Sequence, residues 1–172
     1  MPLGVTPCPV PDGTALAAYR EQGAFTDCYR IALEGEFAQS AYVEAFYTTW
    51  LFKLERLILA RFINRPSTDA EAAALARGAT DNFAAWRVEH RGEREILLSD
   101  FVGRTRSWLM SAPADPGRGT LLYFGSAIVP TAITGTDRRE IGWTFRALSR
   151  FHHWYSIALL AAARSRLRRK QH

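Results

Sequence analysis

Hydrophobic and polar residues change their spacing several times along the chain, and the changes separate two long helices by a block of strands. Asp27–Glu34 alternates between the two classes, as a strand with one buried face does. Residues 40–63 and 139–169 carry apolar side chains at helical spacing, whereas 84–129 returns to short alternating runs. This order predicts an α+β fold of the helix-grip kind, in which a curved antiparallel sheet wraps around a long C-terminal helix.

The first long helix is expected from Ser40 to about Ile63, and it has two apolar sectors. The broader sector is expected to face the core, and its members are Val43, Phe46, Tyr47, Trp50, Leu51, Leu54, Leu57 and Ile58. Ala45, Phe52 and Leu59 form the second sector, roughly opposite the first. A helix with two apolar sides needs cover on both, and a homodimer contact through Phe52 and Leu59 is one way to supply it.

A short helix and four strands are predicted to follow the first long helix. Thr68 and Glu71 have the spacing of a capping box, and Gly78 ends the short helix that they begin. The strands are expected at Ala84–Arg91, Arg94–Val102, Arg104–Ser111 and Thr120–Val129. Their short connections imply antiparallel neighbours.

The connection between the second and third of these strands leaves two registers open. A two-residue turn at Val102–Gly103 would pair Ser99 with Arg106. A three-residue turn would instead place Asp100 opposite Arg106, where an ion pair would fix the hairpin. The register therefore decides whether these two charged residues meet.

The final helix is expected from about Arg139 to Arg169. On its helical wheel His152 and Tyr155 fall on the apolar arc, whereas His153 falls outside it and is expected to face solvent. Trp154 lies on the same broad arc as the inward residues, which is typical of ordinary core.

Composition is that of one soluble globular domain. The 172 residues are 48% hydrophobic and 23% charged, and residues 1–26, which are rich in proline, read as an extended arm before a single domain at 27–172. One helical turn is expected within the arm, at Thr14–Arg20. No apolar stretch approaches the ~20 residues of a membrane span, and no export signal is visible, so a cytoplasmic protein is expected.

The charge and the cysteines exclude several classes of partner. The net charge is +5, and five basic residues lie in the last nine positions, so the rest of the chain is neutral. Basic residues at the end of a helix complement its dipole, whereas a nucleic-acid site extends over a folded face, so nucleic-acid binding is not expected. Cys8 and Cys28 do not have metal-ligand spacing and are expected to be two reduced thiols. No metal site and no cofactor is predicted.

Four stretches carry a resemblance to a known family: Glu44–Arg56, Gly103–Leu109, Leu122–Ile128 and Phe151–Tyr155. They resemble DUF2867, a bacterial family of unknown function that looks related to the START and Bet v 1-like (SRPBCC) superfamily. The resemblance covers about residues 27–165 and implies a helix-grip fold over a hydrophobic cavity. The superfamily pattern has seven strands and only five are predicted here, so the others are sought in residues 1–25 or 130–138.

The leading functional prediction is the binding of an apolar or aromatic small molecule between the sheet and the C-terminal helix. The predicted wall residues are Trp86, Trp108, Tyr123, Phe124, His152 and Tyr155. One alternative is an enzyme of the cyclase, dehydratase or hydrolase kind, with Asp100 or His152 moving a proton and Arg106 stabilising an anion. Another is a dimeric interaction protein without a ligand.

Overall fold

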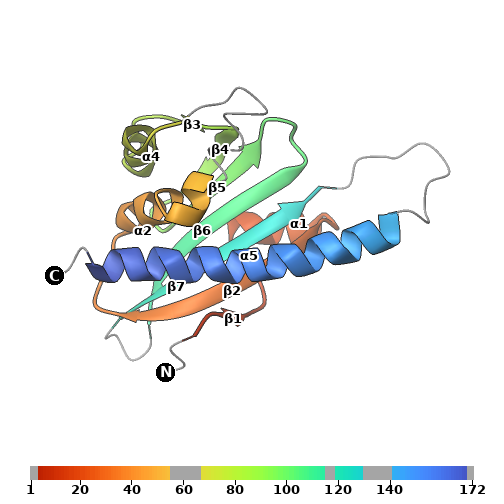
Figure 1. Cartoon of the computed structure of the whole chain (residues 1–172), viewed down its shortest axis with the longest axis horizontal. Coiled ribbons are helices and arrows are strands. Elements are labelled where there is room, and N and C mark those ends of the chain that lie inside the picture. The colour runs from red at the N-terminus through yellow and green to blue at the C-terminus, as the bar shows by residue number, and fades with distance from the viewer. Residues whose placement is uncertain (1–3, 55–66, 115–118, 130–140, 170–172) are drawn as a thin grey trace.

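The computed structural model describes residues 4–54, 67–114, 119–129 and 141–169, and in the last of these ranges it describes side chains from residue 153 onward. Within these ranges seven strands form one curved, open, antiparallel sheet in the order β1-β2-β7-β6-β5-β4-β3 (Figure 1). The strands are β1 (Thr6–Pro7), β2 (Phe25–Glu34), β3 (Asn82–Phe83), β4 (Trp86–Arg91), β5 (Glu95–Asp100), β6 (Thr105–Pro113) and β7 (Gly119–Ile128). The α+β class and the five predicted strands are confirmed.

Two further strands complete the sheet at its edges. β1 lies within residues 1–25, one of the two regions in which a missing strand was expected, and it pairs with β2. β3 was not predicted, and it pairs with β4 through Asn82 and Phe83. The other region, 130–138, lies outside the described residues.

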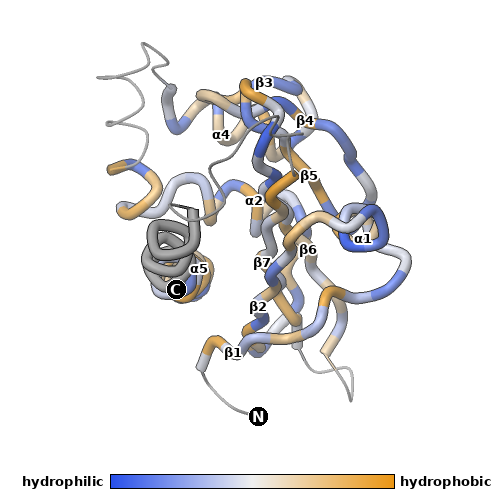
Figure 2. Tube along the Cα trace, turned by 90° about the vertical axis from the view of Figure 1, so that its right-hand side faces the viewer, coloured by the Kyte–Doolittle hydropathy of each residue, from blue (hydrophilic) through white to orange (hydrophobic). Residues whose placement is uncertain are grey.

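Helices cover both faces of the sheet. On one face lie α2 (Gln39–Tyr47) and α5 (Ile141–Arg169), with α5 crossing β2 and β7 and packing beside α2. The opposite face carries α1 (Ala15–Glu21), and α4 (Asp69–Ala76) packs beside α2 (Figure 2). The sheet is therefore the middle layer of the molecule.

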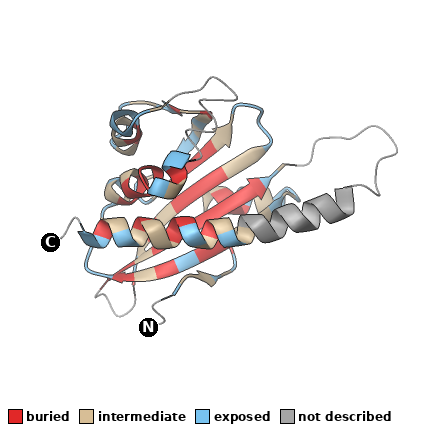
Figure 3. Cartoon of the chain, viewed as in Figure 1, coloured by how far each residue is buried: buried red, intermediate tan, exposed pale blue. Residues whose placement is uncertain are grey.

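Buried residues occur along the strands and on the helices that cover them (Figure 3). The alternation of each strand divides the buried side chains into two clusters, one on each face. The cluster under α2 and α5 includes Tyr29, Ile31, Leu33, Leu109, Leu122 and Phe124 from the sheet. The cluster under α1 and the arm includes Cys28, Leu97, Trp108, Tyr123 and Ala127, with Val10, Leu16 and Ala17 above them. Residues 4–26 are thus part of the fold, because they supply β1, α1 and the cover of one face.

The first long helix is interrupted, which corrects the prediction of one continuous helix. α2 ends at Tyr47, and helical structure resumes at residue 50 after a turn. The hydroxyl of Thr48 donates to the carbonyl oxygen of Glu44 at 2.6 Å, and the hydroxyl of Thr49 donates to the carbonyl oxygen of Phe46 at 2.9 Å. The Thr49 hydroxyl also accepts the amide N–H of Phe52 at 3.2 Å, as the cap of a new helix does.

Beyond this interruption Phe52, Trp50 and Leu54 lie on faces opposite to those predicted, whereas Leu51 still packs against the core. Phe52 is only 3% exposed and packs against Tyr47 and Phe83, whereas Trp50 is 70% exposed and Leu54 is 49% exposed. Phe52 is therefore a core residue of its own chain, and the dimer contact expected through it is wrong in that respect. Leu59 lies outside the described residues.

The local signals at helix ends and at the hairpin are mostly confirmed. The capping box of Thr68 and Glu71 begins α4, and Gly78, with φ of 75°, follows its end. Ser99 pairs with Arg106, as the two-residue turn predicted. No helix among the described residues has an apolar stretch long enough to span a membrane.

Candidate functional site

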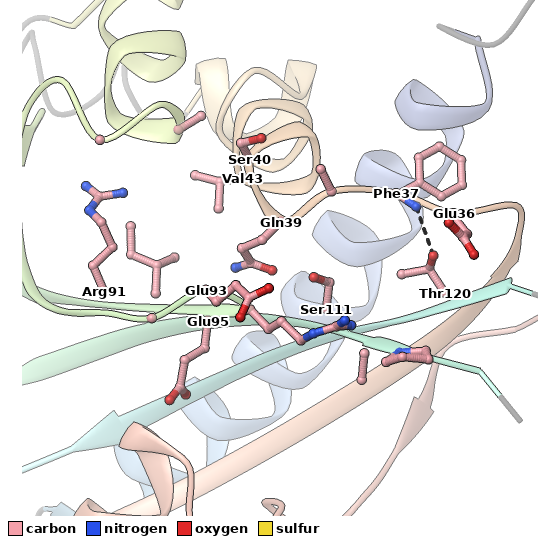
Figure 4. A pocket seen from close by; sticks show the side chains of 18 of the residues that line it. Glu36, Phe37, Gln39, Ser40, Val43, Arg91, Glu93, Glu95, Ser111 and Thr120 are labelled. Carbon is pink, nitrogen blue, oxygen red and sulfur yellow. Dashed lines mark hydrogen bonds between the residues drawn. The ribbon is translucent and has the colours of Figure 1, made fainter. Parts of the chain in front are cut away.

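A hollow of about 730 Å³, partly open to solvent, lies at the end of the sheet where β2, β4 and β6 finish and β5 and β7 begin (Figure 4). The start of α2 and the end of α4 form its other sides. Its lining residues are 36–40 with Val43, 76–78, 91–96, 111–113 and 119–120. Antiparallel pairing brings these segments together, because neighbouring strands start and finish at the same edge.

Thr120 holds the loop that leads from β2 into α2. Its hydroxyl accepts the amide N–H of Phe37 at 3.0 Å and donates to the carbonyl oxygen of Gly35 at 2.9 Å (Figure 4). Gly119 allows β2 and β7 to approach here, because a Cβ on it would lie 2.3 Å from the carbonyl oxygen of Leu33. The loop therefore places the N-terminus of α2 at the hollow.

The N-terminus of α2 carries no side-chain cap. Its N-cap residue is Ala38, and no side-chain cap hydrogen bond is present at this helix end among the described residues. The amide N–H groups of a first helical turn have no partner within the helix, and together they attract negative charge. Ala38, Gln39 and Ser40 all line the hollow, so this positive helix end borders the open space.

Gln39 extends from α2 toward the sheet (Figure 4). Its Nε2 donates to the carbonyl oxygen of Leu109 at 3.0 Å, which fixes the direction of the amide. Its Oε1 is buried and has no hydrogen-bond partner among the described residues. A buried acceptor without a donor is costly, so this oxygen is suited to an N–H or O–H group that enters the hollow.

The charged side chains around the hollow fall into two groups. Arg91 is occupied, since it donates to the carbonyl oxygens of Leu75 and Thr80 and pairs with Asp81 at 3.3 Å. Glu95 is occupied too, since it lies 3.3 Å from Nε2 of His90 and accepts the indole N–H of Trp108. In contrast, the other four charged lining residues make no ion pair with any described residue: Glu36, Arg77, Glu93 and Arg94. The hollow thus offers charges of both signs to a ligand.

The predicted wall residues do not share one cavity. Trp108 and Tyr123 face α1 and the arm, so the expectation that they border a space under α5 is wrong. The reason is strand alternation: Leu109 and Phe124, their neighbours in sequence, occupy the face under α2 and α5.

The other wall residues lie on the expected face but do not line the hollow. Phe124 packs against Phe46 with ring centroids 5.0 Å apart, and Trp86 and Tyr155 pack against the edge of the same cluster. The Nε1 of Trp86 is buried without a partner among the described residues. The side chain of His152 lies outside the described residues.

The predicted catalytic residues Asp100 and Arg106 are also separated. Asp100 Oδ1 accepts the amide N–H groups of Arg104 and Thr105, at 2.8 and 3.2 Å, and so closes the hairpin turn. Arg106 lies on the face of α1, where its Nε is 2.8 Å from a carboxylate oxygen of Glu89 and donates to the Tyr19 hydroxyl at 2.9 Å. Each group serves the fold, and the two do not form a common site.

A second polar cluster joins α5 to the sheet. The Tyr29 hydroxyl lies 2.9 Å from Nδ1 of His153 and 3.5 Å from Oδ2 of Asp27. Oδ1 of Asp27 accepts the hydroxyl of Ser126 at 2.6 Å and its amide N–H at 3.0 Å. His153 was expected to face solvent, and that prediction is wrong because this edge of α5 packs against β2. Burial, with the charge of Asp27, raises the pKa of Tyr29 to about 12, so its hydroxyl stays protonated at neutral pH.

Sequence reasoning missed the hollow and its polar residues. Gln39, Arg94 and Thr120 stand at element ends, where no hydrophobic period marks a position as inward or outward. A usable signal was the polar Gln39 beside the expected start of the first long helix.

A comparison with known proteins finds no family model, no curated protein and no solved structure that matches this chain. The resemblance to DUF2867 and its superfamily therefore stays a prediction.

Proposed function

We propose that the protein binds a small organic molecule in the hollow between α2, α4 and the strand ends. Its volume of about 730 Å³ falls within the range of small-molecule sites, roughly 300–1,000 Å³. The observation that carries the proposal is that Gln39 lines this space, while its Oε1 is buried and has no donor among the described residues. A ligand with an N–H or O–H group would supply that donor.

The proposed ligand also carries an anionic group, such as a carboxylate. The uncapped N-terminus of α2 favours a negative charge, and Arg77 and Arg94 line the same hollow. Glu36 and Glu93 balance these arginines and favour a donor or a positive group on the same ligand. Phe37, Ala112 and Pro113, which are at least partly exposed, provide apolar surface for its body.

The proposed site differs in position and in polarity from the one expected under the C-terminal helix. Between α2 and the sheet the rings of Phe46, Phe52 and Phe124 pack on one another, and the described part of α5 buries Leu159 and Leu160 against the same cluster. α5 packs across β2 and β7, as the C-terminal helix of a helix-grip fold does. The proposed site does not depend on that fold assignment. The hollow lies beside this packed region and has mixed polar and apolar walls.

Native mass spectrometry of protein purified without added ligand tests the proposal. We expect an adduct that denaturation releases, present in the wild type and strongly reduced in Gln39→Leu, which keeps the bulk of the side chain and removes the amide. Arg94→Ala should reduce it as well. Arg87→Ala is the matched control, because Arg87 is exposed on β4 and does not line the hollow. An adduct that persists in both Gln39→Leu and Arg94→Ala would place the ligand elsewhere.

If the purified wild type carries no adduct, a thermal-shift screen decides the question. The panel holds small carboxylates with and without an amine or hydroxyl group. We expect compounds with both groups to raise the melting temperature of the wild type more than that of Gln39→Leu. If no compound separates the two proteins, the proposal is wrong.

A further inference from the structure

The two cysteines of the chain face each other across the edge of the sheet. β1 pairs with β2 in a register that sets Thr6 opposite Arg30 and Pro7 opposite Tyr29. One residue further, Cys8 donates its amide N–H to the carbonyl oxygen of Cys28 at 2.9 Å, and the two Sγ atoms are 3.4 Å apart. The sequence suggested two thiols without a shared role, whereas the fold places them in contact.

The backbone here has the separation that a disulfide requires. Directly opposite residues of an antiparallel pair have Cα atoms about 4.5–5.5 Å apart. Disulfides span Cα distances of about 4.4–6.8 Å, so a pair of neighbouring strand residues lies in the range that a disulfide can join. The sulfurs have only to close from contact distance to bonding distance by side-chain rotation.

We propose that Cys8 and Cys28 are an oxidant-sensitive pair that forms a reversible intramolecular disulfide, with hydrogen peroxide as the class of oxidant. In the first step the Cys8 thiolate attacks one peroxide oxygen, the O–O bond breaks, and the leaving hydroxide takes a proton to become water. Cys8 is then a sulfenic acid. In the second step the sulfur of Cys28 attacks the sulfur of Cys8, the S–O bond breaks, and a second water leaves with the proton of Cys28.

The surroundings of the two sulfurs assign these roles. Cys8 is partly exposed, so peroxide can reach it, whereas Cys28 is 4% exposed. The hydrogen bond with Cys28 and the charge of Arg30 lower the pKa of Cys8. The same hydrogen bond and burial raise the pKa of Cys28. Cys8 is therefore the reactive thiol and Cys28 the resolving one.

The bond would fasten the N-terminal arm to the body of the sheet. β1 contributes only two ladder residues, and the arm nearby places Val5 against one core cluster and Val10 in the other. Oxidation would close a covalent loop through α1 and hold the cover of the Trp108 face in place. A thiol reductant would reverse the bond and return the arm to non-covalent contacts alone.

Peroxide treatment of the full chain, followed by alkylation under denaturing conditions and intact mass measurement, tests this proposal. We expect the wild type to lose the mass of two hydrogen atoms, to accept no alkyl group, and to recover both thiols with dithiothreitol. Its melting temperature should rise on oxidation by roughly 6–12 °C. Cys8→Ser should show neither change, and circular dichroism checks that this variant is folded.

Four results would overturn the proposal. The first three are thiols that stay alkylatable after peroxide, separate oxidation of each sulfur to sulfinic or sulfonic acid, and a disulfide formed only between two chains. The fourth is an oxidised wild type that melts at the same temperature as its reduced form. Cys28→Ser is the second variant, and in it Cys8 should stop at the sulfenic acid, which dimedone labels.

Discussion

The carboxylate of Glu95 accepts a hydrogen bond from the indole Nε1 of Trp108 at 2.6 Å, and through the same oxygen it accepts the amide N–H of Ala15 at 3.1 Å. Trp108 is fully buried at the centre of the sheet, and Ala15 is the first residue of α1. One side chain at the start of β5 therefore joins the covering helix to the sheet. It also provides a charge for the positive end of that helix.

Glu95→Ala should destabilise the protein by about 2–3 kcal/mol, because it leaves the buried Trp108 Nε1 without an acceptor. Urea unfolding followed by tryptophan fluorescence measures the change. Glu93→Ala is the matched control, since Glu93 stands in the same turn, is exposed, and makes no ion pair with a described residue. Its stability should stay within about 0.5 kcal/mol of the wild type. Equal losses in the two variants would contradict the role assigned to Glu95.

Phe52→Ala should cost about 3–5 kcal/mol of unfolding free energy, because it opens a cavity beside Tyr47, Phe46 and Phe83. Trp50→Ala should change stability little, since that side chain is 70% exposed. The pair tests the interruption at Thr48 and Thr49, because an unbroken helix would give the opposite order. Denaturant unfolding of both variants under one set of conditions decides between them.

Stability should fall as the pH rises above 10, and Tyr29 should contribute to the fall. Its pKa is about 12 in the folded chain and near 10 when unfolded, so between these values the folded state holds a proton that the unfolded state has lost. Such a group lowers the unfolding free energy by up to about 1.4 kcal/mol per pH unit, and below pH 10 its contribution is constant.

Tyr29→Phe should therefore make the alkaline fall less steep, and unfolding curves at several pH values measure this. At neutral pH the same variant should lose about 1 kcal/mol, because His153 and Asp27 lose the Tyr29 hydroxyl. Tyr42, whose pKa burial raises well above 10, will keep part of the slope in both proteins. An identical slope with and without the Tyr29 hydroxyl would show that its environment is not as described.

The alternating strands were predictable because each has one side against a core. β2, β5, β6 and β7 follow the expected ranges to within a few residues, and the capping box of α4 is a local signal that requires no tertiary knowledge. β1 and β3 have two residues each, which is too short for alternation to be visible. Their existence depends on an edge that the rest of the sheet provides.

The faces of the first long helix were not predictable from periodicity. Thr48 and Thr49 are compatible with a continuous helix and with an interrupted one. The interruption depends on hydrogen bonds from their hydroxyls to carbonyl oxygens of the preceding turn. After it, Phe52 and Trp50 exchange places relative to the core. A wheel drawn across the break assigned each of them to the wrong side.

The candidate site depends on topology more than on pattern. Gln39, Arg77, Arg94 and Thr120 come from four separate stretches of the chain, and only the order of strands brings them to one edge. The aromatic residues predicted as a pocket wall follow the alternation of buried positions along their strands. Because this sheet is covered on both faces, that alternation identifies buried residues but not the face on which each one lies.

The pairing of β2 with β7 sets the order in which the molecule can assemble. β2 is synthesised before β3 to β6, yet its longest ladder, from Phe25 with Ile128 to Glu34 with Gly119, needs β7, which is made after all of these strands. Closing so long a loop is slow, because its entropy must be lost before the contacts form. On the ribosome β3 to β6 can pair as local neighbours, while β2 must wait as an open edge until β7 emerges. The folding phase that is limited by loop closure should therefore be the pairing of β2 with β7.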